Sequence, residues 1–257
     1  MSKNMNRRRF MGRGGGIDTD ALEYINAVGL TNVNQINAIN NLVEDLKSSG
    51  LWSKLEGVYP IMGDTLEKAG YNLKKYYTNN LLLEKPSEIS NLGYGIIFNY
   101  DTPKIMYPTV SAISHHISIY VRNALTDKFT HINAGDISDS KYSITIPNSS
   151  NVYFNFAYTS CQGVMNNSIG RGYFVFDKLD NYIQVYQDAN RIINQFDTQS
   201  QLFKTGYIYF NQVSEGFYTN PIPYGFITIG YGLGKTLCDK LYDAVTKFLK
   251  SIGKLYV

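Results

Sequence analysis

From residue 94 onward, apolar and polar residues alternate with the period of two that is typical of β-strands. The clearest run places Ile113, His115, Ile117, Ile119 and Val121 on one face, and Ser114, His116, Ser118, Tyr120 and Arg122 on the other. Residues 152–158 alternate in the same way, and shorter strands are expected over residues 95–100, 129–133, 142–146, 172–176, 182–186, 207–211 and 226–229. Turn signals separate these strands and no helical segments intervene, so the pattern predicts a sandwich or barrel of short strands.

The two ends of the chain carry the helical period instead. Asp18 or Thr19 begins a first expected helix, and Gly29 stands where a left-handed cap would end it. The second expected helix has an apolar stripe, with one polar interruption, made of Val33, Ile36, Ile39, Asn40, Val43 and Leu46. Gly50 closes it, and one more short helical turn is predicted around Trp52, ended by Gly57 and Pro60. A last helix, ended by Gly253, is predicted from the stripe Leu237, Leu241, Val245, Phe248 or Leu249, and Ile252.

These patterns predict a mainly β fold: an antiparallel β-sandwich, jelly-roll or concanavalin-like, with a short N-terminal helical segment and a C-terminal helix. The expected organisation is a flexible basic anchoring arm over residues 1–16, a helical segment over 17–60, the β-sandwich over 61–232 and a C-terminal helix packed on it over 233–257. Because helices this short are marginal alone, we expect the N-terminal ones to pack on the sandwich or on a neighbouring subunit.

Charge is distributed unevenly along the chain. Five cations precede the first acidic residue, Asp18, and removing them from the net charge of +3 leaves the remainder at −2. A flexible arm of this kind can dock on an acidic protein surface or on phosphates, or remain a solvated tail. It lacks the interleaved aromatic residues of single-strand binders, so we expect a protein groove and no nucleic acid. The candidate anchor residues are Lys3, Arg7, Arg8, Arg9, Phe10 and Arg13.

The remaining composition narrows the class of protein. A hydrophobic fraction of 44% with 18% charged residues fits a folded domain with a buried core. Cys161 and Cys238 lack metal-ligand spacing and are expected to be reduced, buried thiols. No apolar run approaches the roughly 18 residues that span a bilayer, and the arginine pair in the arm lacks the apolar stretch of an export signal. We therefore expect no membrane contact and assembly in a cytosol.

The glycine-rich segment Gly230-Tyr231-Gly232-Leu233-Gly234-Lys235-Thr236 is the most suggestive motif, since it follows a strand and opens a helix. A Walker phosphate loop requires glycine where Ile229 stands, and the chain lacks the alternating strands and helices of such enzymes. A glycine-rich turn is therefore favoured over a nucleotide site, and no cofactor is expected.

Other catalytic arrangements are also disfavoured. His115 and His116 are adjacent in a strand and point to opposite faces, so they do not readily share a metal ion; His115 is expected in the core, and His131 has no local partners. No Gly-x-Ser-x-Gly elbow occurs, and Cys161 would need a histidine brought to it by the fold. The pairs Asp136/Asp139 and Asp177/Asp180 could hydrolyse sugars, but both are expected in turns, where Asp is common for local reasons. We expect no enzyme.

Tyrosine is abundant, at 22 residues. Exposed tyrosines suit sugar stacking or protein contacts, whereas buried ones fill a core, and the sequence leaves both roles open. The tyrosines of the β region are Tyr76, Tyr77, Tyr94, Tyr100, Tyr107, Tyr173, Tyr182, Tyr186, Tyr207, Tyr209, Tyr218 and Tyr224.

Two stretches of the chain resemble a known family. Near the start stand Ala27-Val28-Gly29-Leu30-Thr31, residues 35–47, 50–55 and 58–60, and near the end stand residues 226–233, 241–245 and 248–254. Together they resemble virion structural proteins of tailed phages, of the crAss-like phage head-fibre type, in which helical ends flank a variable β domain. The resemblance covers about a third of the chain, and Gly70 and Gly234 depart from the family's usual residues.

The resemblance implies a non-enzymatic head fibre or capsid decoration subunit on the particle surface, assembled in the bacterial cytoplasm. It would be a homo-oligomer, in the trimeric form common to fibres, that binds other virion proteins through its arm and contacts a host surface glycan. Two alternatives remain open, a tail-associated protein and a carbohydrate-binding adhesin module. A glycan depolymerase and an NTPase rank below them.

Overall fold

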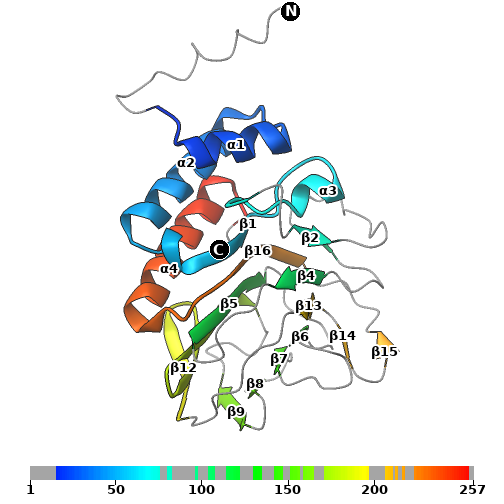
Figure 1. Cartoon of the computed structure of the whole chain (residues 1–257), viewed down its shortest axis with the longest axis vertical. Coiled ribbons are helices and arrows are strands. Elements are labelled where there is room, and N and C mark those ends of the chain that lie inside the picture. The colour runs from blue at the N-terminus through cyan, green and yellow to red at the C-terminus, as the bar shows by residue number, and fades with distance from the viewer. Residues whose placement is uncertain are drawn as a thin grey trace, which may run out of the picture.

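The structure of the protein is a computed structural model. It describes residues 16–75, 80–82, 96–97, 104–107, 114–121, 130–134, 142–146, 151–156, 159–164, 171–196, 206–210, 212–213, 216–217 and 223–254. The predicted fold class is confirmed: the chain is mainly antiparallel β-sheet, with helices at its two ends (Figure 1).

Two large antiparallel sheets form the body. The first sheet has the order β1 (Leu55–Tyr59), β16 (Pro223–Gly230), β5 (Ser114–Val121), β10 (Gly172–Leu179), β11 (Tyr182–Gln187) and β12 (Asn190–Phe196), and β3 (Ile96–Ile97) also pairs with β16. The second sheet has the order β2 (Leu81–Leu82), β4 (Lys104–Tyr107), β13 (Gly206–Phe210), β6 (Thr130–Ala134), β7 (Tyr142–Ile146), β8 (Asn151–Phe156) and β9 (Thr159–Val164). A short hairpin joins β14 (Gln212–Val213) to β15 (Gly216–Phe217).

The helices begin and end where their capping residues predict. Asp18 caps α1 (Thr19–Val28), and Gly29 ends it in the left-handed conformation, with φ of 75°. Asn32 caps α2 (Val33–Ser48) by accepting hydrogen bonds from two backbone N–H groups. The C-terminal helix α4 (Gly234–Ser251) follows β16, and α3 (Leu66–Ala69) is a single turn.

One predicted helical turn is wrong beyond its first residues. Trp52–Lys54 form a 3-10 helix, but Leu55–Tyr59 continue as strand β1 at the edge of the first sheet. The strand forms because β16, far away in the sequence, offers an antiparallel partner, with Val58 opposite Thr228. The expected helical segment of residues 17–60 therefore contributes one strand to the body.

The first sheet is the central layer of the molecule. Helices α1, α2 and α4 gather on one of its faces, and the strands of the second sheet lie on the other side (Figure 1). Consequently β10 is buried on both faces from Tyr173 to Lys178. The helix-side core is built from α2, α4 and the sheet, and its largest contributors are Ile39, Leu42, Leu46, Tyr120, Tyr173, Tyr186, Phe226, Leu241, Val245, Phe248 and Leu249.

This layering buries both faces of β5. The alternation along β5 gives the strand one apolar face and one polar face. In a sandwich of only two sheets, the polar face would contact water. The helices cover the polar face, so His116, Ser118 and Tyr120 are buried as completely as Ile117 and Ile119. The buried polar groups need internal hydrogen-bond partners, and those partners define much of the site described below.

The two sheets meet closely at one edge. β12 contacts β9, and a Cβ placed on Gly163 of β9 would overlap the Ile193 side chain and the Ile192 carbonyl of β12. Only glycine permits this approach of two backbones. The contact fixes β12 at the rim of the sandwich, with its other face directed away from the second sheet.

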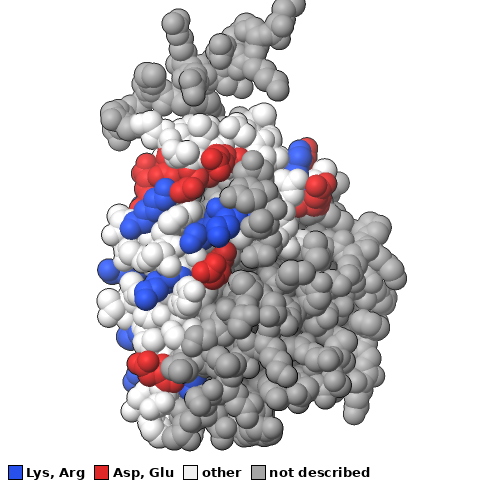
Figure 2. All heavy atoms as spheres, viewed as in Figure 1, with Lys and Arg blue, Asp and Glu red and all other residues white. Residues whose placement is uncertain are grey.

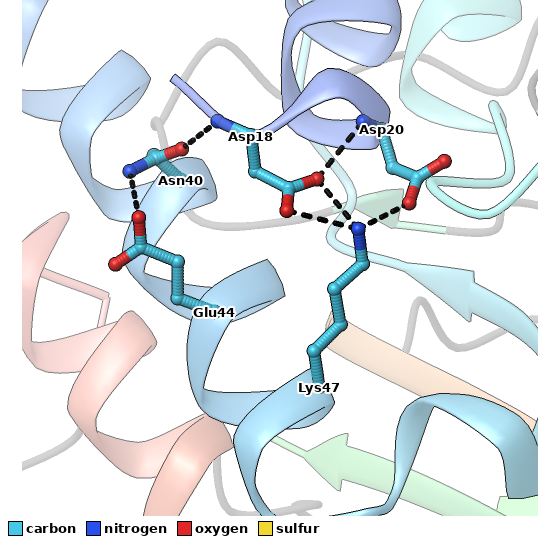
Figure 3. Close-up of polar contacts among 5 residues, drawn as sticks. All are labelled: Asp18, Asp20, Asn40, Glu44 and Lys47. Carbon is cyan, nitrogen blue, oxygen red and sulfur yellow. Dashed lines mark hydrogen bonds and ion pairs between the residues drawn. The ribbon is translucent and has the colours of Figure 1, made fainter. Parts of the chain in front are cut away.

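A small polar network fastens the start of α1 to α2 (Figure 3). Asn40, the predicted polar interruption of the α2 stripe, accepts a hydrogen bond from the Asp18 N–H at 2.7 Å and donates to Glu44. Lys47 binds the carboxylates of both Asp18 and Asp20. Burial acts to raise the pKa of Asp18, but hydrogen bonds from Lys47 and the Asp20 N–H lower it overall. This network therefore holds the start of α1 firmly against α2.

Candidate functional site

The glycine-rich connection between β16 and α4 is clamped by side chains of two neighbouring strands. The Tyr231 carbonyl accepts a hydrogen bond from His116 Nδ1 at 2.7 Å, and the Gly232 N–H donates to Ser114 Oγ at 3.0 Å. The Leu233 and Gly234 N–H groups donate to the two carboxylate oxygens of Asp177, at 2.8 and 2.9 Å. Four consecutive residues of the connection are thus bound to β5 and β10.

This clamp explains why the segment is not a phosphate loop. A helix N-terminus attracts anions because its first N–H groups lack partners inside the helix. Here the Asp177 carboxylate already occupies that position. Lys235, the residue that would reach a phosphate, instead pairs with Asp239 one turn along α4. The geometry supports the predicted glycine-rich turn.

Asp177 also corrects a prediction, because it lies within strand β10 and not in a turn. Its partners are more than fifty residues away in the sequence, so no local pattern could reveal them. Burial raises the pKa of Asp177 to about 6, although the two backbone N–H donors act in the opposite direction. Asp180, the other member of the proposed pair, lies in the β10–β11 turn and is exposed, with φ of 52°.

A chain of buried hydrogen bonds crosses three strands beside this clamp. His116 Nδ1 donates to a carbonyl, so in the neutral ring Nε2 accepts from Thr228 Oγ1, at 3.0 Å. Thr228 Oγ1 in turn bonds Ser118 Oγ, which lies 2.6 Å from the Tyr173 hydroxyl. Burial lowers the pKa of His116 to about 4, against the smaller opposing effect of its bond to Tyr231, so the ring is neutral at physiological pH.

The same residues do not form a hydrolytic centre. His116, Ser118, Thr228 and Asp177 are each 0% exposed, so a substrate has no path to them. Cys238 of α4 is a free thiol, also buried, and burial raises its pKa. The group ties helix α4 to the first sheet, and its chemistry is structural.

A strip of the first sheet extends from the buried Tyr186, beside α4, to the exposed Tyr182 and Phe196. Three cross-strand pairs make up this β11–β12 strip: Tyr182 opposite Phe196, Gln184 opposite Asn194, and Tyr186 opposite Arg191. Tyr186 belongs to the helix-side core and its ring lies 5.8 Å from the Lys235 ammonium, which places the strip on the helix side of the sheet. The Tyr186 end of the strip lies beside the first turn of α4.

Its aromatic end is unusually open. Tyr182 is 46% exposed and Phe196 is 55% exposed, and their rings meet edge to face with centroids 5.5 Å apart. Large apolar side chains are normally exposed singly, so two exposed aromatic rings in contact indicate a contact surface. Val164 of β9, which is 66% exposed, adds apolar surface at the same rim of the sandwich, where β9 contacts β12.

The middle of the strip is a ladder of amides. The Tyr186 hydroxyl donates to Gln184 Oε1 at 2.6 Å, and Gln184 Nε2 donates to Asn194 Oδ1 at 2.9 Å. These bonds fix both amides in orientation and leave further donor and acceptor positions on each for a ligand. Preorganised polar groups beside exposed aromatics are what a small polar ligand with apolar faces requires.

The register of β12 brings a cation to the far end of the strip. The pairing shifts between Val185 and Tyr186, so Arg191 and not Ile192 lies opposite Tyr186. An extra residue in one strand re-aims the side chains around it. Arg191 is exposed and forms no ion pair within the part of the chain that the structure describes.

Elsewhere on the helical layer, charges of both signs alternate. Figure 2 shows lysines and acidic residues interspersed over α1, α2 and α4, and several of them form ion pairs, such as Lys247 with Asp45. Trp52 lies beside two cations, with Lys47 and Lys74 ammonium groups 5.4 and 5.2 Å from its ring. Lys74 also donates to the Trp52 and Leu55 carbonyls, so this group braces the start of β1.

The sequence anticipated only part of the strip. Tyr182 and Tyr186 belong to the predicted tyrosines, and the structure divides them, since Tyr182 is exposed while Tyr173 and Tyr186 are buried. Gln184, Arg191, Asn194 and Phe196 were missed. The alternation of Tyr182, Gln184 and Tyr186 in the predicted strand could have indicated a mixed polar and aromatic face.

Several predicted residues lie outside the described part of the chain. These are the anchor residues Lys3, Arg7, Arg8, Arg9, Phe10 and Arg13, the pair Asp136 and Asp139, and the side chains of Cys161 and His131. Their roles stay predictions. His115 is buried, as expected, and His116 is buried as well.

Two kinds of site are absent from the residues that the structure describes. Their His, Cys, Asp and Glu side chains form no group of three that could hold a metal ion. Among their helices, none combines the length and apolar character that crossing a bilayer requires.

No protein-family model matches the chain, and no curated protein sequence matches it. Solved structures with the same fold do exist. The binding domain of Paraclostridial Mosquitocidal Protein 1 superposes with a TM-score of 0.57 at 12% identity, over 75% of this chain and 52% of that one. The ligand binding domain of botulinum neurotoxin serotype D, in complex with N-acetylneuraminic acid, gives 0.50 at 13% identity, over 74% and 50%.

A Trypanosoma rangeli sialidase gives a TM-score of 0.52 at 11% identity, over 80% of this chain and 39% of the sialidase. The chain therefore spans about half the length, or less, of the structures it resembles. At these identities of 11–13% the similarity establishes the β-sandwich fold alone.

Proposed function

We propose that the protein is a non-catalytic carbohydrate-binding module, and that the β11–β12 strip is its contact surface. The observation that carries this proposal is the exposed Tyr182–Phe196 pair beside the oriented amides of Gln184 and Asn194. A sugar ring presents an apolar face edged by hydroxyl groups. Aromatic rings contact the face and amides bond the hydroxyls, which the strip offers within one hairpin.

The comparisons support the same class of function. Two of the similar structures are named as binding domains of toxins, and one of these was solved with N-acetylneuraminic acid. The position of the ligand is not transferred from those proteins, because identities of 12–13% indicate a shared fold and no shared binding site. What supports a glycan here is the chemistry of this chain's own strip.

A glycan array with the purified protein, followed by calorimetry on the glycans that bind, tests the proposal. We expect Tyr182→Ala and Phe196→Ala each to weaken binding at least tenfold while the thermal unfolding curve changes little, because both side chains are exposed. Val33→Ala is the matched control, since Val33 is equally exposed but lies at the start of α2. Binding that survives both strip variants would place the ligand elsewhere.

We further propose that this module is carried on a phage particle, as a homotrimeric head fibre or capsid decoration subunit. The support is the family resemblance, together with the position of the stretches that carry it. Those stretches form the end of α1, most of α2 and part of α4, which pack on one face of the first sheet, together with parts of β1 and β16, which are neighbouring strands of that sheet (Figure 1). The two ends of the chain thus form one packed unit. Such a unit can serve as the conserved base of a subunit whose β domain varies between family members.

The arm supplies the test of this second proposal. Deleting residues 1–15 is expected to leave a folded oligomer, measured by light scattering, that no longer incorporates into particles. The start of α1 is independently fastened by Asp18, Asn40 and Lys47, so the deletion should not unfold the body (Figure 3). Normal incorporation of the truncated protein would remove the anchoring role from the arm.

A glycan depolymerase is the rival that the same surface could suggest. The proposal that the module is non-catalytic predicts that host capsule incubated with the protein yields no new reducing ends. Release of such ends, abolished by substituting Asp136 or Asp139, would overturn it.

A further inference from the structure

The two ends of the β11–β12 strip differ in charge. Same-face residues of a strand are separated by about 6.7 Å, so the strip extends over roughly 13 Å from the aromatic pair to the Tyr186–Arg191 pair. The aromatic end carries no charge on its own two residues, while the far end is flanked by Arg191 of β12 and Lys235 of α4. A ligand lying along the strip would meet a neutral end and a cationic end.

The acidic groups near the cationic end are mostly engaged elsewhere. Asp239 pairs with Lys235. Asp188, in the β11–β12 turn, accepts a hydrogen bond from the Tyr173 N–H at 2.8 Å, and the positive charge of Arg171 acts to lower its pKa, which burial raises overall. Asp177 is bound to the α4 N-terminus. Within the described ranges of the chain, none of these carboxylates forms an ion pair with Arg191.

Arg191 is exposed directly opposite the buried Tyr186, so its guanidinium can reach a ligand that lies along the strip. Burial raises the pKa of Tyr186, and the positive charge of Arg191 acts in the opposite direction, as expected for two groups directly across the hairpin. The guanidinium presents paired N–H donors in a plane, a geometry that matches a carboxylate. The Tyr186 hydroxyl is committed to Gln184, so it leaves the guanidinium as the strongest donor at this end.

We propose that the strip selects acidic saccharides, with the ligand carboxylate bound by Arg191 and its sugar rings lying over the amides toward Tyr182 and Phe196. This inference rests on the proposed carbohydrate binding and names its ligand class. Arg191 is the specificity-determining residue, and Lys235 adds long-range attraction while paired with Asp239. The aromatic pair contributes affinity that does not depend on ligand charge.

Calorimetry with a glucuronic-acid-containing tetrasaccharide and with its carboxyl-reduced form tests the inference, since the two differ only at the acidic group. The acidic form is expected to bind at least tenfold more tightly than the reduced form. Arg191→Gln should remove this preference. Its affinity for the reduced form should equal that of the unsubstituted protein. Lys250→Gln, which removes the same charge from the far end of α4, should leave the preference intact.

The outcomes separate this inference from the function beneath it. Equal binding of the acidic and reduced forms to the unsubstituted protein would overturn the acidic preference and keep carbohydrate binding. A preference that persists in Arg191→Gln would overturn the role of Arg191. Binding of neither form, together with no signal for sialyllactose or lactose, would count against carbohydrate binding itself.

Discussion

Asp177 and His116 lie directly opposite each other on β10 and β5, and both bind the connection that leads into α4. Each is a buried titratable group, and burial shifts the two pKa values in opposite directions, to about 6 for the carboxyl and about 4 for the imidazole. Both shifts disfavour the charged form. The pair therefore links the stability of the α4 attachment to pH in two compensating ways.

The first prediction concerns that compensation. The raised pKa of Asp177 contributes stability below its unfolded pKa of 3.8, and this contribution is lost as pH rises to about 6. The lowered pKa of His116 contributes stability above 6.5, and this is lost as pH falls to about 4. Each effect is worth about 3 kcal/mol, so they nearly cancel between pH 4 and 6.

Urea unfolding at a series of pH values measures the effect. Across that window the free energy of unfolding should be nearly constant for the unsubstituted protein, rise with pH for Asp177→Asn, and fall with pH for His116→Gln. Parallel curves for all three proteins would show that neither group titrates as its burial requires.

A second prediction isolates the bond between β10 and the helix. Asp177→Ala leaves two buried N–H groups at the start of α4 without an acceptor, which should lower the free energy of unfolding by about 3 kcal/mol. Asp180→Asn, in the exposed turn three residues later, tolerates the same backbone conformation and should change it by less than about 0.5 kcal/mol. Chemical denaturation of the two variants checks this, and similar losses in both would contradict the clamp.

A third prediction follows from the filled anion position at α4. ATP, GTP and inorganic phosphate should leave the melting temperature unchanged, because Asp177 holds the N–H groups that a phosphate would need. Lys235→Ala should cost less than about 0.5 kcal/mol, since it removes an exposed i,i+4 pair and one contact of its ammonium group with the Tyr186 ring. A nucleotide-dependent thermal shift that Lys235→Ala abolishes would restore the phosphate-loop interpretation.

A fourth prediction concerns the start of the body. Lys47→Met removes the partner of two carboxylates, so it should loosen the first turn of α1 and lower stability by about 1 kcal/mol. Hydrogen exchange of the α1 amides is the direct measurement. Lys68→Met is the control, because its exposed pair with Asp64 holds no other element. If both variants leave α1 exchange unchanged, Asp18 and Lys47 do not fasten the helix.

Local patterns predict the elements whose cause is local. Helix α2 and strand β5 could be predicted because each has one apolar face with a regular period. The ends of α1 could be predicted because Asp18 and Gly29 are typical capping residues. Strand β1 was not predicted because its own residues indicate only the end of a helix, while its pairing partner β16 is far away in the sequence. β12 escapes because the extra residue near Arg191 interrupts the period of two.

The site is harder to predict because its exposure depends on where α4 begins to cover the first sheet. Tyr182 and Tyr186 lie on the same face of strand β11. Tyr186 is buried because α4 covers it, whereas Tyr182 is exposed. Likewise Asp177 reads as a turn residue until α4 supplies its partners. Such information resides in tertiary packing, which no window of sequence contains.

Mapping a bound oligosaccharide by amide chemical shifts tests the central claim most directly. Adding a glycan identified on the array to isotope-labelled protein should shift the amides of Tyr182–Gln187 and Asn190–Phe196, and the start of α4, with little change at α1 and α2. Shifts confined to other elements, with the β11–β12 strip unperturbed at saturation, would contradict the account.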